Sequence, residues 1–540
     1  MGVYSNAKGT RPMSEKMQPG TDQAPHFVFF ITDQQRADWL GCYGHPVVNT
    51  PHIDALSEKG TRFDNFHVAS PVCMPNRASL LTGRYPSVHG LRYNGCTLPK
   101  RANTFVDILA RSGYKTAAFG KTHLQPFTGL KAPNDQPDIV DEAWQLEGDD
   151  YTLEEPQHYD GGSYFDFPTP YYGFQHVNMV TGHGVQVGGH YLQWLRKNHP
   201  DWQQWVDTDI QFPHSYTCPQ VNRTTMPEEA YPTFYIRDRA IEYLRHNLQQ
   251  KQPTFTFISF PDPHHPWNPP GRYWDMYSPD QFTVPVGFED HNNPPPNLAY
   301  LHQQFLKGDL PAAKQIAFMA DSQHIKEAMA LTAGMITMVD DAIGDIVQAV
   351  KATSSGGNTI FCLTSDHGDY LGDFDLLLKG SWPKESICRV PFIWCEPSGH
   401  QVSHTDALCS TIDIASTILG RAGLPLYNGI QGRSLLPVLR GEVRNKDFRA
   451  SLLLEMNDLT PRFGFTKAAR VRQLLKDAWA LTVYAGEDWG ELYNRADDPN
   501  ECRNLWGDPE YVEVQAALVM ELSVQLIKQM DESPRAQRYA

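Results

Sequence analysis

Cys73, Pro75 and Arg77 have the types and spacing of a nucleophilic centre, in the segment Cys73-Met74-Pro75-Asn76-Arg77. Pro75 suits the first turn of a helix, and Gly83 suits its end. The sequence therefore predicts a helix that begins beside Cys73, where free backbone N–H groups and the helix dipole favour an anion. Arg77, one turn further on, is then in reach of the nucleophile or of an oxyanion.

Together with the tail Ala78-Ser79-Leu80-Leu81-Thr82-Gly83-Arg84, this segment resembles the active-site motif of the sulfatase family in the alkaline phosphatase superfamily. In that family the motif cysteine is oxidised to formylglycine (3-oxoalanine), and the hydrated aldehyde is the nucleophile. The resemblance implies this role for Cys73 after modification by a formylglycine-generating enzyme. Outside such a motif, an isolated free cysteine is more often a buried structural residue.

Two pairs of polar residues, Asp33-Gln34 and Asp366-His367, each follow an apolar run of strand length. Their oxygen and imidazole groups suit a divalent cation. The resemblance implies that they bind one metal ion together with the formylglycine oxygen derived from Cys73. The oxygen-rich set favours Ca²⁺, and the imidazole leaves Mn²⁺ open. Many sulfatases have Asp in place of Gln34 and Asn in place of His367, so these two residues resemble the phosphonate monoester hydrolase and bacterial arylsulfatase branch.

Two lysines and two histidines lie in further segments that resemble the family. Gly120-Lys121-Thr122-His123-Leu124 is similar to its G-K-x-H-L element. This implies that Lys121 contacts the sulfate oxygens and that His123 is the base that expels sulfate. His264, in a P-H-x-P-W segment, and Lys379 match the remaining histidine and lysine. We expect His264, with or without Lys379, to protonate the leaving oxygen, as ester cleavage requires.

Three other polar residues in these regions have a weaker claim to function. His265 falls on the variable position of the P-H-x-P-W segment, so we interpret it as a residue that supports the catalytic side chains from behind or lies on the site's rim. His183 lies in the glycine-rich stretch 181–189, where a loop histidine more often has no catalytic role. Asp369 only flanks the Asp366-His367 pair.

The elements that must position these residues alternate between strands and helices. Apolar strand-like runs are 27–32, 254–260, 359–364 and 390–394, and helical stretches are 104–111, 234–245 and 325–351. This alternation predicts an α/β fold with a large, mainly parallel central sheet flanked by helices, as in alkaline phosphatase. Ligands of such sheets gather at the carboxyl ends of the strands. Asp33 and Asp366 both follow strands, as this rule requires.

The chain divides by composition into a polar tail (1–25), a catalytic domain (26–444), a C-terminal subdomain (445–525) and a tail (526–540). Two stretches rich in Pro, Gly and aromatic residues, about 125–232 and 262–300, are expected to be loop insertions over the active-site mouth. After residue 445 there are short alternating runs and then an amphipathic helical pattern over 512–530. The stretch 490–505 resembles the C-terminal subdomain of sulfatases, which implies a small antiparallel sheet with a helix. The terminal segment 523–540 leaves a homo-oligomer open.

The net charge of −16 disfavours nucleic acid and anionic membranes as partners. There is no apolar run long enough to span a membrane, and residues 1–26 contain no hydrophobic signal segment. The nine cysteines are odd in number and follow no disulfide spacing. We therefore expect a cytoplasmic protein.

The expected activity is hydrolysis of small sulfate monoesters, with aryl sulfates as the favoured class. The alternative is a phosphonate monoester or phosphodiester hydrolase with the same site. Lys121 and His123 disfavour it, because similar phosphonate hydrolases carry hydroxyl residues there. A catalytically silent scaffold is the third reading, and it is disfavoured because no motif residue is missing.

Overall fold

A computed structural model of the chain describes residues 24–132, 143, 151–250, 252–309, 315–399 and 402–538. Most of the expected tail 1–25, and parts of the expected insertion 125–232 and of the tail 526–540, lie outside the described residues.

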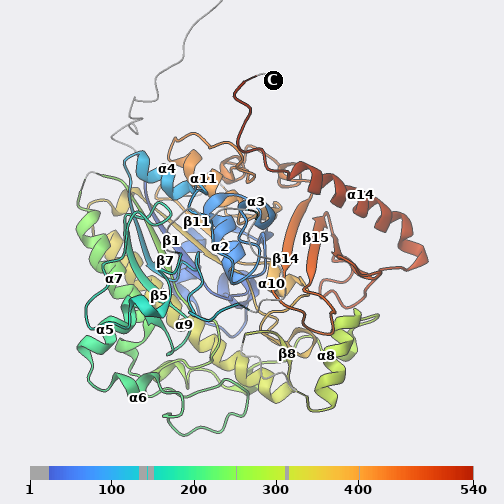
Figure 1. Cartoon of the computed structure of the whole chain (residues 1–540), viewed down its shortest axis with the longest axis horizontal. Coiled ribbons are helices and arrows are strands. Elements are labelled where there is room, and N and C mark those ends of the chain that lie inside the picture. Colours follow the sequence, from blue (N-terminus) through green and yellow to red (C-terminus); the bar gives the residue numbers. More distant parts are fainter. Residues whose placement is uncertain are drawn as a thin grey trace, which may run out of the picture.

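A nine-stranded sheet runs through the centre of the molecule (Figure 1). Its middle strands β9, β1, β7, β4 and β5 run parallel to one another, while β11 and β6 are antiparallel to their neighbours β9 and β5. The order across the sheet is β12 (His404–Thr405), β2 (Thr61–Phe63), β11 (Phe392–Cys395), β9 (Thr359–Ser365), β1 (His26–Thr32), β7 (Thr254–Ser259), β4 (Lys115–Gly120), β5 (His176–Thr181) and β6 (Gly188–Gly189). The predicted mainly parallel α/β fold is confirmed.

Strand β1 shows why the central strands read as continuous apolar runs. Successive side chains of a strand point to opposite faces, and both faces of this sheet are covered. Phe27, Phe29 and Ile31 enter one hydrophobic core, and Val28 and Phe30 enter the other. Each is fully buried.

Helices cover both faces of the sheet (Figure 1). Buried side chains of α7 and α9 share a core with Val28 and Phe30, and those of α2, α4 and α11 share a core with Phe27 and Phe29. These helices are α2 (Cys73–Thr82), α4 (Phe105–Arg111), α7 (Pro232–Asn247), α9 (Ser322–Lys351) and α11 (Asp413–Arg421). The others before residue 450 are α1 (Pro51–Lys59), α3 (Pro86–His89), α5 (His190–Asn198), α6 (Trp202–Val206), α8 (Pro296–Leu306), α10 (Glu385–Cys388), α12 (Leu436–Leu439) and α13 (Asn445–Phe448).

A separate antiparallel sheet follows near the C-terminus, with its strands in sequence order. It consists of β14 (Leu452–Asn457), β15 (Arg470–Lys476), β16 (Trp479–Tyr484) and β17 (Gly490–Asn494). Leu453, Leu474 and Leu481 share a hydrophobic core with Leu518 and Leu522 of α14 (Val512–Lys528). Two short strand pairs complete the described elements: β3 (Phe66–His67) with β13 (Cys409–Ser410), and β8 (Phe318–Met319) with β10 (Leu376–Leu377).

The stretch 125–232 is more regular than its sequence indicates. It contributes β5 to the central sheet, paired in parallel with β4, and it also contains α5 and α6. The interpretation of this whole stretch as irregular loop is therefore wrong. The last five residues of β5 are buried, but the flanking glycines and aromatic residues obscure its short apolar pattern.

Across the described ranges, none of the helices combines the length and the apolar character that a bilayer crossing requires. All nine cysteines are free thiols in the structure, and Cys362 and Cys395 are buried in the core as their apolar surroundings indicated.

Candidate active site

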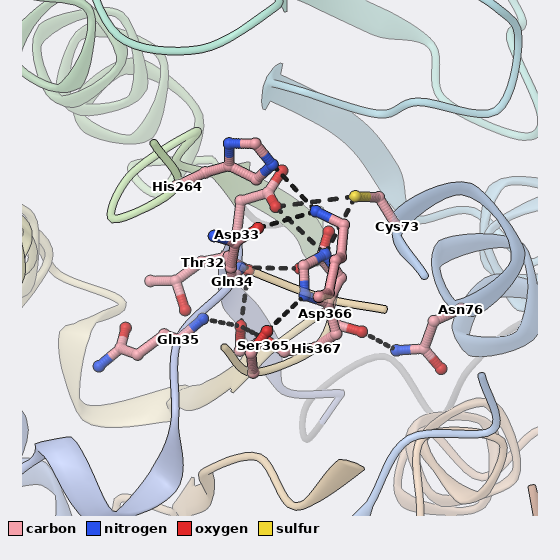
Figure 2. Close-up of polar contacts among 12 residues, drawn as sticks. Thr32, Asp33, Gln34, Gln35, Cys73, Asn76, His264, Ser365, Asp366 and His367 are labelled. Carbon is pink, nitrogen blue, oxygen red and sulfur yellow. Dashed lines mark hydrogen bonds and ion pairs between the residues drawn. The ribbon is translucent and has the colours of Figure 1, made fainter. Parts of the chain in front are cut away.

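The predicted site residues meet at the carboxyl edge of the parallel strands (Figure 2). Asp33 directly follows β1, Asp366 follows β9, and Lys121 follows β4. His264 comes five residues after the end of β7. Since the carboxyl ends of parallel strands share one edge, residues far apart in the sequence are brought together there.

Cys73 is the first residue of α2 and its side chain is buried, with 2% exposure. Gly83 ends the helix with φ of 62°, a left-handed conformation that glycine adopts without strain, as its position predicted. Asn76 fixes the first turn to the sheet. Its amide nitrogen donates to the backbone oxygen of Asp366 at 2.7 Å, and its oxygen accepts from the Thr411 hydroxyl at 2.7 Å. The sequence analysis assigned no role to Asn76.

Four of the predicted ligands form one cluster: Asp33, Cys73, Asp366 and His367 each place a ligand atom within 4.8 Å of the other three. The Cys73 sulfur lies 3.0 Å from Nε2 of His367 and 3.9 Å from Oδ1 of Asp33. Nδ1 of His367 donates to the Gly368 carbonyl at 2.8 Å. This bond leaves Nε2 facing the cluster, the arrangement that a metal-binding imidazole requires.

Arg77 contacts the carboxylates of the cluster rather than the nucleophile. Its Nε donates to Asp366 at 2.7 Å, and Nη2 lies 3.5 Å from Asp33. Nη1 donates to the Lys121 carbonyl at 2.6 Å and to the Ser259 hydroxyl at 2.8 Å. With every guanidinium nitrogen engaged in this way, Arg77 orients two of the metal ligands. The expectation that it holds the nucleophile is corrected accordingly.

Gln34 lies between the acidic cluster and a lysine. Its amide oxygen accepts from Nζ of Lys379 at 2.8 Å, and its amide nitrogen donates to Asp369 at 2.6 Å. Burial raises the pKa of Asp369 to about 6. Asp369 thus fixes the orientation of the Gln34 amide, a supporting role that its position beside the Asp366-His367 pair only hinted at.

Lys121 donates to Asp33 at 2.5 Å and to Nε2 of His183 at 2.7 Å. The His183 ring stacks on that of His264, with ring centroids 3.5 Å apart. Burial, followed by the charge of Lys121, lowers the pKa of His183 to about 3, so its imidazole is neutral and able to accept. The sequence analysis gave His183 little weight, because a histidine in a glycine-rich loop carries no local sign of this contact.

Lys379 and His264 form a hydrogen-bonded pair. Nζ of Lys379 donates to Nε2 of His264 at 3.0 Å, and Nδ1 of His264 donates to the His265 carbonyl at 2.6 Å. Burial, with the nearby charges of His183 and Lys379, holds the pKa of His264 well below its usual value. His264 is therefore neutral, and its Nε2 accepts the hydrogen bond from Lys379.

His123 is buried, and burial together with Lys121 and Arg77 holds its pKa well below the usual value. Within the described residues, its Nδ1 has no hydrogen-bond partner. The loop that carries it is anchored on Glu154, which accepts from the backbone N–H groups of His123 (3.0 Å), Leu124 (2.9 Å) and Gln125 (3.3 Å). Nothing in the sequence around Glu154 indicated this role.

The thiol of Cys73 is acidified by its surroundings. Burial and Asp33 each raise its pKa, but Lys379, His367 and Lys121 outweigh them, so the pKa lies below that of an ordinary cysteine. The same three residues would favour any anion that forms at this position.

A pocket of about 500 Å³ opens over Cys73. Its lining includes His123, His183 and Lys379 on the catalytic side. The remaining wall is largely apolar and includes Val72, Met74, Tyr93, Phe127, Leu130, Met456, Leu459 and Phe463. A small organic ester fits such a pocket with its reacting group at Cys73.

Replacing His183 by alanine is expected to lower kcat/KM about tenfold, since the Lys121 ammonium loses one of the two groups that hold it. His183→Gln keeps an acceptor and should recover part of the loss. Steady-state kinetics on both variants, with metal content measured alongside, check this. An alanine variant with wild-type kinetics would remove His183 from the site.

Glu154→Gln is expected to lower the free energy of unfolding by about 2 kcal/mol, because a buried charged acceptor of several hydrogen bonds is lost. Glu155→Gln, at the half-buried neighbouring position, is the matched control and should change stability by less than about 0.5 kcal/mol. Urea unfolding of the two variants measures the difference. Equal midpoints would show that the His123 loop does not depend on Glu154.

The donor set fits a divalent metal ion. Two buried carboxylates, Nε2 of His367 and the nearby amide oxygen of Gln34 are the ligand types that Ca²⁺ or Mn²⁺ accept. Arg77 and Lys121 place positive charge beside these two buried carboxylates and so favour their ionised, metal-binding form.

Comparison with known proteins identifies the family of the chain. The sulfatase family model matches residues 25–424, and that of the C-terminal region of N-sulphoglucosamine sulphohydrolase matches residues 373–529. An arylsulfatase from Clostridium perfringens (strain 13 / Type A) is 27% identical over 502 residues, covering 91% of this chain and 92% of its own length. An N-acetylglucosamine-6-O-sulfatase from Bacteroides thetaiotaomicron is 24% identical, with coverage of 99% and 91%.

The solved structure of a phosphonate monoester hydrolase from Agrobacterium radiobacter superposes with a TM-score of 0.74 at 24% identity, covering 94% of this chain and 97% of that one. It has the same fold. The chain belongs to the sulfatase family, in the alkaline phosphatase superfamily. It is accordingly an enzyme of the sulfuric ester hydrolase class.

Proposed function

We propose that this enzyme hydrolyses sulfate monoesters of aryl-sized alcohols, with Cys73 converted to formylglycine. The observation that carries the proposal is the position of Cys73. It begins a helix, lies 3.0 Å from His367 of the ligand cluster, and faces a pocket also lined by His123 and Lys379. Formylglycine at this position supplies a geminal diol whose hydroxyl attacks the ester.

Positive charge at the inner end of the pocket suits the sulfate group. The net charge of the chain is −16, so an anionic substrate depends on local cations. Lys121 and Lys379 are both buried beside Cys73, and each ammonium, which already donates two hydrogen bonds, has one N–H left. These groups hold the equatorial oxygens of the sulfate.

The acid and the base are different residues of the site. Lys379, hydrogen-bonded to His264, supplies the proton for the leaving oxygen, and His264 Nε2 positions its ammonium. The buried, neutral imidazole of His123 accepts the proton of the second hydroxyl of the sulfated formylglycine, so that the C–O bond to sulfate breaks and the aldehyde re-forms.

Asp33, Gln34, Asp366 and His367 would hold one divalent ion, Ca²⁺ by preference and Mn²⁺ as the alternative. Such an ion would supply Lewis-acid chemistry there, favouring the ionised form of the nucleophilic hydroxyl. Arg77 keeps Asp33 and Asp366 in place for it.

The aromatic and aliphatic wall of the pocket supports an aryl leaving group. Phe127 and Phe463 offer ring faces, and Val72 and Leu459 add apolar surface. An apolar wall of this kind gains contact with an aromatic ring and little with a small alkyl group.

The test is a comparison of kcat/KM for three compounds with the same 4-nitrophenyl group: a sulfate monoester, a phenylphosphonate monoester and a phosphodiester. We expect the sulfate ester to be the best substrate. A phosphonate or phosphodiester hydrolysed faster than the sulfate would replace the proposal with the alternative hydrolase.

A further inference from the structure

The loop between β14 and β15 supplies one wall of the pocket, through Asp458, Leu459, Arg462 and Phe463. Exposure increases from the reacting end outward. Cys73 is 2% exposed, whereas Arg462 is half-buried. Since the sulfate binds at Cys73, this loop faces the organic part of the ester that leaves.

Arg462 is held in place through its backbone and its neighbour. Its carbonyl accepts from the N–H of Phe465 at 3.0 Å, which closes a turn. The ring of Phe463 packs against Trp382, with ring centroids 4.7 Å apart. The guanidinium therefore extends from an anchored stretch of backbone, which limits the entropy lost when it binds a ligand.

Within the described part of the chain, the Arg462 guanidinium donates no hydrogen bond and has no carboxylate at ion-pair distance. Arg470, at the end of the same loop, behaves differently: it donates to the backbone oxygens of Asp458 at 2.7 Å and Ala469 at 3.1 Å. Arg462 is thus a cation in a pocket wall with its donors free.

Asp458, an acidic residue of the same loop, does not neutralise Arg462 through a hydrogen bond. The Asp458 carboxylate accepts from the Ser381 hydroxyl at 2.6 Å and is 8% exposed. Burial raises the pKa of Asp458 and the positive charge of Arg462 acts to lower it, but no hydrogen bond joins the two side chains. A free guanidinium beside apolar walls binds a planar oxyanion strongly, because its parallel N–H groups match two oxygens and the surroundings screen weakly.

We propose that Arg462 binds a second anionic group, a carboxylate or another oxyanion, on the leaving group of the substrate. The preferred substrate class is then a sulfate ester whose aromatic or cyclic alcohol carries a negative charge remote from the ester. The proposal rests on the proposed function, since the sulfate end of the ester defines which part of the substrate reaches the loop.

The test uses 4-(sulfooxy)benzoate and its methyl ester, which share the ring and the sulfate and differ in the remote charge. The measured quantity is the ratio of kcat/KM for the acid to that for the ester. Arg462→Gln is expected to lower this ratio about tenfold, or ~1.4 kcal/mol. The two phenols differ in reactivity as leaving groups, but this difference is the same for every variant. It therefore cancels when the acid-to-ester ratio of kcat/KM is compared between variants.

Lys467→Gln is the matched control, because it removes one positive charge from an exposed position of the same loop. It should leave the ratio within twofold of wild type. An equal fall in Lys467→Gln, or an unchanged ratio in Arg462→Gln, overturns the proposal. Arg462→Lys keeps the charge without the paired donors and is expected to recover part of the preference.

Calorimetric binding of 4-hydroxybenzoate and of methyl 4-hydroxybenzoate separates this proposal from the proposed function. Wild type should bind the acid more tightly than the ester, and Arg462→Gln should lose that preference, whether or not the enzyme hydrolyses sulfates. If Arg462→Gln loses the preference for the acid, the role of Arg462 is supported, whether or not the sulfate esters are turned over. Failure to turn over the sulfate esters would contradict only the proposed function. Equal binding of both compounds to wild type overturns the role of Arg462.

Discussion

Replacing Cys73 by alanine or serine is expected to lower kcat/KM for the sulfate ester by at least about 10⁴-fold, because the nucleophile is lost while the rest of the site remains. We expect Cys73→Ser to be as inactive as Cys73→Ala, because the modifying reaction that converts a cysteine thiol to formylglycine requires the thiol. Both variants should fold, because Cys73 contributes only a small side chain to the end of α2.

The chemical state of Cys73 is measured directly by mass spectrometry of the tryptic peptide that carries it. Conversion to formylglycine lowers the peptide mass by about 18 Da relative to the thiol. A thiol that persists even after co-expression with a formylglycine-generating enzyme would contradict the mechanism. So would near-wild-type turnover by a carefully purified alanine variant. Cys502→Ala, a partly exposed cysteine in the C-terminal region, is the control and should retain full activity.

Sequence alone predicted the parts of the site that lie in short motifs. Asp33 and Asp366 each follow an apolar strand run, so strand order and the carboxyl-edge rule were enough to bring them together, whereas Cys73 was predicted from its motif. Lys121 and Lys379 followed from resemblance, and the structure places both within hydrogen-bond distance of other predicted residues. Short motifs and the parallel order of the strands were therefore sufficient to predict these site residues.

The residues that sequence missed act through contacts between distant segments. Glu154 anchors the His123 loop from about thirty residues further along, and His183 reaches Lys121 from the turn after β5. An isolated acid or a loop histidine has no neighbouring pattern that signals such a contact. For Arg77, the position on α2 was predicted correctly, but its contacts were not. Its partners are Asp33 and Asp366, which follow two strands that are distant from α2 in the sequence.

The charges around Asp33 explain why several residues of the active site are needed together for catalysis. Asp33 is shared by Arg77, Lys121 and His367, with Lys121 the shortest contact at 2.5 Å. Burial raises the pKa of Asp33, and Lys121 and His264 more than offset that effect, so its pKa is held well below the usual value. Asp33 is therefore charged, and a metal ion must compete with Lys121 for it.

Removing the metal ion is expected to lower kcat/KM at least about 100-fold, and adding Ca²⁺ should restore it more fully than adding Mn²⁺. The reason is that Asp33, Asp366 and His367 converge as ligands beside Cys73, where a divalent ion would lower the pKa of the nucleophilic hydroxyl. Dialysis against a chelator, followed by elemental analysis and titration of each metal, measures the effect. Saturating metal should also raise stability by about 2.7 kcal/mol at 100 times its Kd.

Asp366→Asn tests the same centre from the protein side. It weakens both the ligand set and the 2.7 Å contact with Arg77, so we expect loss of bound metal and of most activity. Asp369→Asn, which touches Gln34 alone among the predicted ligands, should cost about 10- to 100-fold. Asp447→Asn, on the surface beside Arg444, is the control and should change neither quantity. Full turnover by metal-free enzyme, or by Asp366→Asn without bound metal, would show that the cluster of carboxylates is structural and that catalysis proceeds on Cys73, the lysines and the histidines alone.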